Sequence, residues 1–314
     1  MSKRSTVHII HPGLFTTVQD LGRLGSQAQG VPVGGPLDRL SARQANWLVG
    51  NSVRTPLLEM TISGPTLRFT EDTWIALCGG SIEAFIGNRS IKTYQSYLVR
   101  AGEELRAGRI TTGIRTYLAI GGEWEVASWL GSTSAWSIGE QTFPEGALLQ
   151  KGQGLSITPQ EGRIQFIGER ERTSPQGAIR VVAGPEWKWF SEVSQQRFLE
   201  ERWTLSSQSN RMAQKLEPGL AMEEAVPELI SSPVWPGTIQ CTATGQLMIL
   251  QTDAQTTGGY PRLAQVIEAD LDRLAQRKPG QQCSFIQVNL GQAQRLFTQY
   301  MAQLERWSLW HTMG

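Results

Sequence analysis

The chain has 314 residues, a length that suits two domains of about 150 residues better than one hydrophobic core. Its 29 basic and 28 acidic residues leave a net charge of +1. This balance excludes the positive field that concentrates nucleic acid or anionic lipid, so we expect neither as a partner. No stretch reaches the roughly 18 apolar residues of a membrane span, and the N-terminal residues lack the apolar run of a secretion signal, so we expect a cytoplasmic protein.

Short β-prone runs separated by turn residues occupy most of the chain. Its 33 glycines and 15 prolines are spread evenly between runs of β-branched and aromatic residues, a pattern typical of a mostly β, α+β protein. No helical period between these runs is long enough for repeated βαβ units, which argues against a doubly wound parallel sheet. We expect strands at residues 74–77, 116–120, 164–167, 179–182, 247–251 and 284–288.

Four segments carry helical spacing. The first has Asp38 as its cap and Gly50 as its end. The second, which follows Pro185, would place Val193 and Phe198 on one side. The apolar period is clearest in the last. We expect helices at residues 38–49, 186–198, 261–278 and 293–304.

A polar, charged segment at residues 168–177 resembles an exposed connector. We therefore expect an N-terminal half at residues 1–170 and a C-terminal half at residues 171–314. A weak internal sequence similarity supports two related halves. In each half a Pro-Gly pair is followed by threonine and then by glutamine, which is Gln19 in the first half and Gln240 in the second.

The first candidate site lies in the Gly-rich segment at residues 12–38. Polar side chains that could bind a ligand fall between glycines that let a backbone approach it closely: Thr16, Thr17, Gln19, Asp20 and Arg23. The alternative is a structural hairpin with an internal Asp20–Arg23 ion pair. Asp38, after the second Gly-Pro turn, is either the cap of the first helix or an acid, base or ligand anchor.

The second candidate site is the segment Gln255, Thr256, Thr257, Gly258, Gly259 and Tyr260. We expect it to follow an apolar strand and to open a helix, whose backbone N–H groups could hold a carboxylate, a carbonyl oxygen or a phosphate. A purely structural turn is the alternative. The segment lacks the Gly-Lys-Ser/Thr ending of a Walker loop, so the sequence does not support a complete ATP site on this chain alone.

Histidine and cysteine offer little chemistry in this chain. Its three histidines, His8, His11 and His311, argue against a zinc site and a Ser-His-Asp triad. The three cysteines are too far apart for a metal or redox motif, and we interpret them as small buried apolar residues. An active site would therefore use carboxylates, hydroxyls, arginine and backbone dipoles, with no metal.

Eight motifs in order carry a resemblance to a known family. They are Pro12–Arg23, Gly30–Asp38, Ser41–Asn51, Leu58-Glu59 with Gly64-Pro65, Tyr117–Gly122, Leu130-Gly-Ser132, Pro236–Gln240 and Gln255–Pro261. Together they are similar to allophanate hydrolase subunit 2, a family that includes the C-type subunit of 5-oxoprolinase and the biotin-dependent carboxyltransferase domain of urea carboxylase. The resemblance runs almost from end to end.

The resemblance implies a fold of two cyclophilin-like β-barrel halves packed around a cleft, with a few short helices. It implies a C-type subunit of a 5-oxoprolinase complex, an ATP-dependent lactam hydrolase that converts 5-oxoproline to glutamate. Its partners would be a subunit 1-type cyclophilin-like protein and a further hydrolase subunit, and the complex rather than this chain could bind ATP. The alternatives are transfer of a carboxyl group from carboxybiotin to urea, or a non-catalytic regulator that binds a subunit 1 partner.

For the site, the resemblance implies one wall with Gln19, Asp20 and Arg23 and another with residues 255–260. Asn51 would bind substrate nearby, and Asp38 and Asn46 are the candidate catalytic residues. The chain also departs from the family pattern, most clearly in three segments: Thr133-Ser134-Ala135 for Arg-Ser-Thr, Asn210-Arg-Met-Ala213 for Asp-Arg-Met-Gly, and Cys241–Gly245 for a Pro-Pro-Asp-Gly turn. These departures affect the identity of the substrate more than the fold.

Overall fold

The computed structural model describes residues 4–220 and 229–308, which form two compact units. Unit 1 contains residues 4–23, 34–174 and 304–308, and unit 2 contains the remaining described residues, 24–33 and 175–303 with the gap at 221–228. The main division falls between Ser174 and Pro175, inside the predicted connector and four residues beyond the predicted boundary at 170/171. Two short segments are exceptions to this division. Residues 24–33 come before it but belong to unit 2, and residues 304–308 come after it but belong to unit 1.

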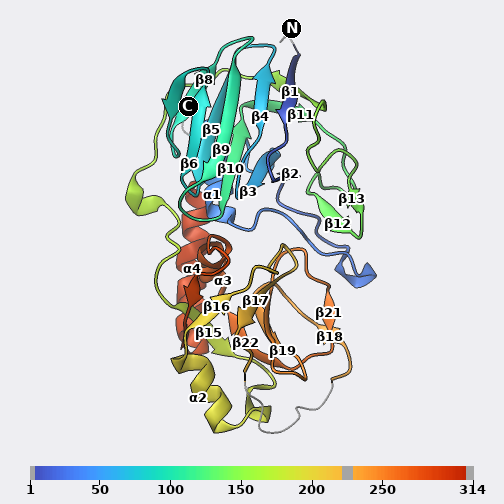
Figure 1. The fold of residues 1–314 in the computed structure, drawn as a ribbon, viewed down its shortest axis with the longest axis vertical. Helices are drawn as coiled ribbons and strands as arrows, with labels where there is room; N and C mark the ends of the chain where they lie inside the picture. Colours follow the sequence, from blue (N-terminus) through green and yellow to red (C-terminus); the bar gives the residue numbers. More distant parts are fainter. Residues whose placement is uncertain (1–3, 221–228, 309–314) are drawn as a thin grey trace. The chain divides into compact units, whose positions relative to one another are not determined.

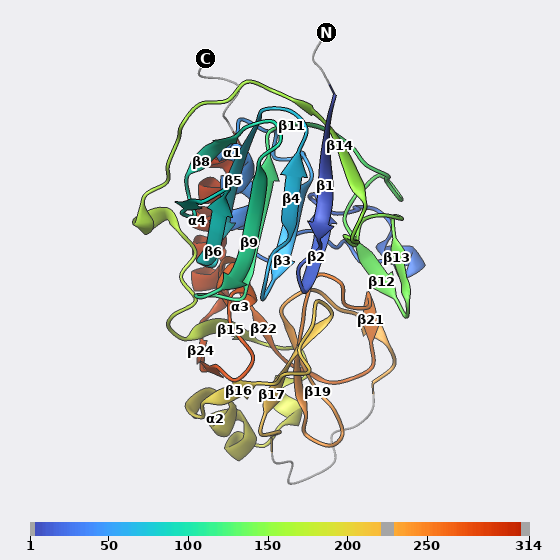
Figure 2. The same ribbon diagram turned by 45° about the horizontal axis from the view of Figure 1, so that its top comes forward.

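Unit 1 is built on two antiparallel sheets, drawn in blue to green in Figure 1. The seven-stranded sheet has the order β11 (Gly122–Glu125), β14 (Gly154–Pro159), β1 (Ser5–His11), β4 (Thr66–Phe69), β9 (Glu104–Ile110), β6 (Ile82–Ile86) and β7 (Arg89–Ile91). The five-stranded sheet has the order β2 (Phe15–Gln19), β3 (Leu57–Thr61), β10 (Arg115–Ile120), β5 (Thr73–Gly79) and β8 (Ser96–Val99). Apolar side chains from both sheets form one continuous core. Figure 2 shows a separate hairpin of β12 (Trp136–Ile138) and β13 (Gln141–Phe143).

The predicted strands at 74–77 and 116–120 are confirmed as parts of β5 and β10. Helix α1 (Arg39–Leu48) is confirmed as well: Ser41 N donates to the Asp38 carboxylate at 2.9 Å, and Gly50 follows the helix in a left-handed conformation. The predicted strand at 164–167 is wrong. Phe166 makes an isolated bridge to Gln95, and the backbone of the segment bonds to residues 94–96 around that bridge without forming a continuous ladder.

Unit 2 contains one eight-stranded sheet and a two-stranded ladder. The sheet has the order β23 (Gln282–Cys283), β16 (Trp203–Leu205), β17 (Ala213–Glu217), β20 (Leu247–Leu250), β19 (Thr238–Cys241), β22 (Arg262–Val266), β15 (Ile179–Ala183) and β24 (Phe285–Gln287). The ladder joins β18 (Ser232–Pro233) to β21 (Thr257–Gly258). The predicted strands at 179–182, 247–251 and 284–288 are therefore confirmed within a residue or two at their ends.

The helices of unit 2 correct two predictions. The helix expected from residue 261 is wrong in its first half, because residues 262–266 form β22 and α3 (Glu268–Ala275) begins only after Ile267. Pairing of β22 with both β15 and β19 satisfies its backbone groups and overrides the helical spacing that Leu263 forms with the apolar residues after it. The helix expected from residue 186 begins later, as α2 (Glu192–Glu200), and Val193 is exposed while Phe198 is buried.

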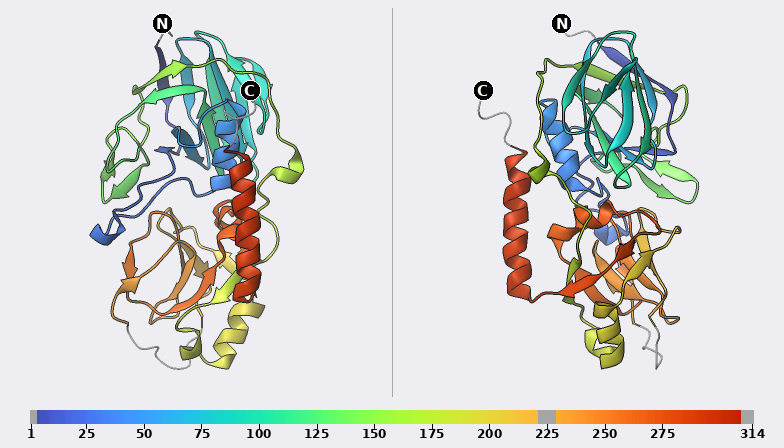
Figure 3. Two further views of the ribbon diagram at one scale, coloured as in Figure 1. Left: turned by 180° about the vertical axis from the view of Figure 1, so that it is seen from behind. Right: turned by 60° about the vertical axis from the view of Figure 1, so that its left-hand side comes forward.

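The fourth predicted helix is confirmed as α4 (Leu290–Arg306), the long red helix in Figure 3. All three cysteines are buried, as the sequence predicted. No helix in the described part of the chain is long and apolar enough to cross a membrane. The mostly β fold class is confirmed by the strands that dominate both units.

Candidate functional site

A pocket of about 400 Å³ lies within unit 2, a volume that suits a small molecule. Three parts of the chain form it: the short 3-10 helix η1 (Gln27–Gln29) with the residues after it, the segment 233–236, and the segment 251–257. None of its fifteen lining residues is charged. Its polar lining consists of amides and hydroxyls from Gln27, Gln251, Thr252, Gln255, Thr256 and Thr257.

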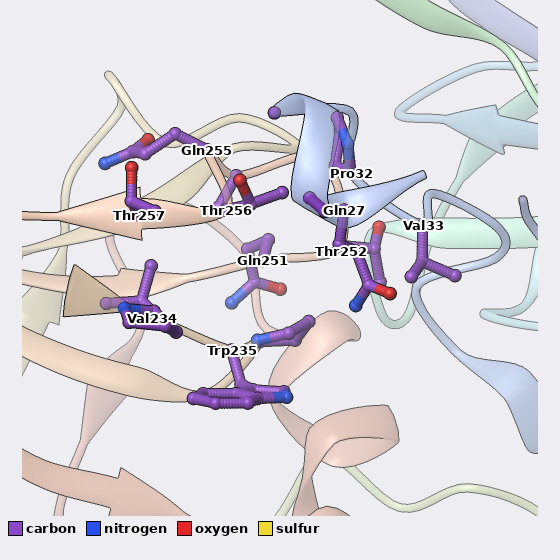
Figure 4. Close-up of a pocket in the computed structure, with 15 residues that line it drawn as sticks. Gln27, Pro32, Val33, Val234, Trp235, Gln251, Thr252, Gln255, Thr256 and Thr257 are labelled. Carbon is purple, nitrogen blue, oxygen red and sulfur yellow. The ribbon is translucent and has the colours of Figure 1, made fainter. Parts of the chain in front are cut away.

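Gln251 contributes an amide to the lining of this pocket, and Trp235 contributes an apolar ring. Figure 4 shows the Gln251 side chain in the middle of the lining residues, with the Trp235 ring on one side of it and Thr256 on the other. The Trp235 side chain is 58% exposed, so most of its ring is open to a ligand. A flat apolar ring beside amides and hydroxyls is suited to a small, neutral, hydrogen-bonding molecule.

A buried ion pair supports one edge of the pocket. Arg211 Nε and Nη2 lie 2.7 and 3.0 Å from the two carboxylate oxygens of Asp253, and both side chains are about 8% exposed. The same Nη2 donates to Thr252 Oγ1 at 3.3 Å. This bidentate pair fixes the turn that carries Thr252 into the pocket wall. Sequence reasoning did not name Arg211, although it noticed the Asn210–Ala213 motif in which the residue stands.

The predicted Gln255–Tyr260 site forms a ladder, not the start of a helix. Thr257 pairs with Pro233 and Gly258 with Ser232, and the chain then enters β22. The expected anion site at a helix N-terminus is therefore wrong. Of the six predicted residues, the pocket brings together Gln255, Thr256 and Thr257. Gly258, Gly259 and Tyr260 are outside the lining.

Asp20 lies in unit 1, where it anchors a loop. Its carboxylate accepts hydrogen bonds from Ser132 Oγ at 2.5 Å, Ser134 Oγ at 2.7 Å, Thr133 N at 2.7 Å and Gly22 N at 2.8 Å. Burial raises the pKa of Asp20, but these hydrogen bonds outweigh it and hold the pKa below its usual value. The carboxylate is thus saturated by its own chain.

Gln19 and Arg23, which lie close to Asp20 in the sequence, are both buried. Arg23 Nη2 donates to the Ser134 backbone oxygen, and its guanidinium lies 5.2 Å from the centre of the Trp129 ring. Gln19 Nε2 donates to Thr17 Oγ1 at 3.0 Å. Gln19, Asp20 and Asn46 share a cavity of only about 10 Å³, which has room for about one water molecule. The substrate-binding roles predicted for these residues stay predictions.

Asp38 is fully buried and makes the contacts of a helix cap. Its carboxylate accepts from Ser41 N at 2.9 Å, from Ser41 Oγ at 2.7 Å and from Thr173 Oγ1 at 3.1 Å. Its backbone N–H donates to the Tyr117 hydroxyl, which in turn donates to Glu59. These contacts explain the residue as a cap, one of its two predicted roles. The catalytic role stays a prediction.

Asn46 and Asn51 form a buried pair of side-chain amides. Asn51 Nδ2 donates to Asn46 Oδ1 at 3.1 Å and to the Ile120 backbone oxygen at 3.0 Å. Asn46 Nδ2 donates to the Thr55 backbone oxygen at 2.8 Å. The pair therefore ties the end of α1 to the end of β10, and the predicted roles of the two residues in the site remain untested predictions.

The family model described as "Carboxyltransferase domain, subdomain A and B" matches residues 29–287. The chain belongs to this carboxyltransferase family. The match confirms the resemblance seen in the sequence, and it covers all of the pocket except Gln27 and Ala28.

Named relatives of this carboxyltransferase-family chain fall into two groups. The C-type subunit of Escherichia coli 5-oxoprolinase is 39% identical over 294 residues, which cover 91% of this chain and 92% of that protein. The urea amidolyase of Lachancea kluyveri is 30% identical over 96% of this chain but only 18% of that protein. The crystal structure of K. lactis urea amidolyase superposes with a TM-score of 0.88 at 28% identity, covering 96% of this chain and 20% of that one.

The pocket of the carboxyltransferase-family chain does not fit ATP. A triphosphate needs cationic side chains, a bound metal or a cradle of N–H groups at a helix start. The lining offers no lysine or arginine, and residues 4–220 and 229–308 contain no group of three or more His, Cys, Asp or Glu that could hold a metal ion. Its amides and hydroxyls are suited instead to a neutral carbonyl or N–H group.

Proposed function

We propose that this chain is the C-type subunit of an ATP-dependent 5-oxoprolinase complex, which hydrolyses 5-oxoproline to glutamate. The observation that carries the proposal is the end-to-end match to the Escherichia coli 5-oxoprolinase subunit, in which nearly all of both chains align. The urea-linked relatives align only as a section of a much longer protein.

In this proposal the pocket binds the lactam amide of 5-oxoproline. The Thr256 and Thr257 hydroxyls and the glutamine amides would donate to the lactam oxygen, whose negative charge grows as the carbonyl is attacked. The ring would pack on Trp235. Because the pocket has no cationic side chain, the substrate carboxylate would point out of it, toward solvent or a partner subunit.

The composition of the lining also explains why the chain should need partners. None of the fifteen lining residues titrates near neutral pH, so the pocket by itself supplies no general acid or base. The pocket also offers nothing that would hold ATP. Partner subunits would therefore bind ATP and supply the proton transfers, and the isolated chain would be inactive.

Reconstitution tests the proposal. The chain is co-expressed with a subunit 1-type protein and a further hydrolase subunit, and glutamate release from 5-oxoproline is followed with and without ATP. We expect ATP-dependent release from the complete set and none when this chain is left out. A complete, correctly assembled complex that releases no glutamate would contradict the proposal.

Carboxyl transfer from carboxybiotin to urea is the second candidate. The amides and hydroxyls of the pocket favour it, since urea and the ureido ring are neutral and offer carbonyl and N–H groups to them. The carboxylate on the ring nitrogen would pass to a urea nitrogen and leave biotin behind. Gln251 and Thr257 would hold such a ring through its carbonyl and N–H groups. Urea consumption that depends on bicarbonate and on a biotin-carrying partner, with no turnover of 5-oxoproline, would select this candidate.

A further inference from the structure

Gln240 lies behind the pocket wall with only half of its amide satisfied. The side chain is fully buried, and its Nε2 donates to the Tyr260 backbone oxygen at 3.3 Å. Its Oε1 has no hydrogen-bond partner within the described residues. An unpaired buried acceptor destabilises a fold, so the surroundings of this amide decide whether it has a role beyond stability.

Gly258 shows how closely this amide approaches the wall. A Cβ atom at residue 258 would lie 2.5 Å from Gln240 Nε2, which no side chain tolerates without displacing the amide. The amide therefore packs directly on the backbone between Thr257 and Gly259. Glycine at this position is what makes that contact possible.

The ladder geometry places Gln240 on the side of the wall that faces away from the pocket. Thr257 and its partner Pro233 line the pocket, while Gly258 is paired with Ser232. Side chains alternate between the two faces of a strand, so the Cβ direction of Gly258 points to the opposite face. Gln240 occupies that direction and supports the wall from behind.

A strand irregularity lies opposite Gln240. The register of β19 against β22 shifts between Ile239 and Gln240. Such bulges turn side chains out of their regular positions and are common beside functional sites. Here the extra residue, Leu263, lies in β22, and the irregularity faces Gln240, the residue of β19 that reaches Tyr260 and Gly258.

We propose that Gln240 is a positioning residue for the pocket: it fixes residues 256–260 from behind, so that the Thr256 and Thr257 hydroxyls point at the bound ligand. It does not touch the ligand itself. The positioning role is inferred from the contacts of Gln240 with the pocket wall. Only the predicted effect on KM for 5-oxoproline rests on the proposed function. The competing explanation is a glutamine that merely fills the core.

Gln214 provides a matched control on β17 of the same sheet. Its side chain is also buried, its Nε2 donates to a backbone oxygen, that of Leu274, at 3.2 Å, and its Oε1 also has no partner in the described part of the chain. Gln214 is not among the residues that line the pocket. Methionine at either position keeps the length of the side chain and removes the amide.

The first measurement is hydrogen exchange of the full chain, which needs no substrate. In Gln240→Met, backbone amides in the peptides covering residues 229–235 and 252–262 should exchange about fivefold faster, the factor expected from the loss of one hydrogen bond. Gln214→Met should leave these peptides unchanged. Gly258→Ala, which displaces the Gln240 amide, should reproduce the effect. Equal exchange in Gln240→Met and Gln214→Met would overturn the proposal.

The second measurement uses the reconstituted complex. Gln240→Met should raise KM for 5-oxoproline about fivefold and change kcat by less than about twofold, because the wall is displaced while the reacting groups remain. Gln214→Met should keep both constants. Faster exchange in Gln240→Met without a change in KM would show that the wall does not position substrate. If the wild-type complex has no turnover at all, the proposed function fails, and the exchange comparison alone decides the role of Gln240.

Discussion

Asp20 in unit 1 and the pocket wall in unit 2 look alike in sequence but differ in how their polar groups are used. Both lie among glycines, threonines and glutamines. The Asp20 carboxylate accepts five hydrogen bonds from its own chain, whereas the hydroxyls of Thr256 and Thr257 line an open pocket. The first arrangement stabilises a loop, and the second is available to a ligand.

The difference teaches that residue type alone does not separate an anchor from a binding site. Polar side chains between glycines are found both in a ligand site and in a loop anchor. What distinguishes them is whether the donors and acceptors already have partners inside the fold. The predictions below test that distinction.

Removal of the Asp20 carboxylate should have the largest effect. In Asp20→Ala the five donor groups of Ser132, Thr133, Ser134 and Gly22 lose their acceptor together, and the free energy of unfolding should fall by about 3 kcal/mol. Urea unfolding followed by tryptophan fluorescence measures the loss. Asp72→Ala, which removes an exposed partner of Arg100, is the control and should change little. Similar small losses in both variants would contradict the anchor role.

Removal of the Trp235 ring should weaken binding with little loss of stability. Trp235 is largely exposed, and a ring that packs on a ligand is worth about 0.5–1.5 kcal/mol beyond its area, so KM of the reconstituted complex for 5-oxoproline should rise about tenfold in Trp235→Ala. Trp189→Ala, at another exposed tryptophan outside the pocket, should keep the wild-type KM. An unchanged KM in Trp235→Ala would remove the ring from the binding site.

Loss of one wall hydroxyl should have a smaller effect. Thr257→Val keeps the shape of the side chain and removes a donor, which should raise KM about fivefold, as expected for one hydrogen bond. Thr244→Val, at an exposed threonine of the same unit, is the matched control. Steady-state kinetics of both variants would show whether the hydroxyl takes part. Equal KM values would argue that ligand hydrogen bonds come from other groups.

The smallest effect should be the dependence on pH. The folded-state pKa of Asp20 is lowered, so its stabilisation is complete above the unfolded value of about 4 and is lost as the pH falls through the folded value. The difference in unfolding free energy between wild type and Asp20→Ala should therefore stay constant from neutral pH to about 5 and shrink below about 4. A difference that stays constant down to the lowest pH at which the protein folds would mean that the ionised form is not what stabilises the loop.

The sequence predicted the parts of the fold that depend on local pattern. Five of six strands and the cap at Asp38 were found where expected, because β-branched runs, a capping residue and a terminal glycine act over a few residues. It failed at residues 261–266, where Leu263, the first residue of an apolar helical spacing, lies in a strand paired on both sides. That pairing comes from β15 and β19, which are distant in sequence.

The candidate site was predicted only in part for a similar reason. Gln255, Thr256 and Thr257 stood out as a motif, but Trp235, Gln251 and Arg211 reach the pocket or its edge from three separate loops. No local pattern links them. Gln240 was part of the internal sequence similarity with Gln19, yet only the structure shows its amide against Gly258.

One measurement tests the contrast between the two regions most directly. Amide chemical shifts of the full chain are recorded by NMR as 5-oxoproline is added, alone and within the reconstituted complex. We predict that the signals of Gln251, Thr256 and Thr257 move with ligand concentration while those of Gly22 and Thr133 stay in place. Shifts confined to Gly22 and Thr133, with the signals of residues 251–257 unmoved, would contradict the account.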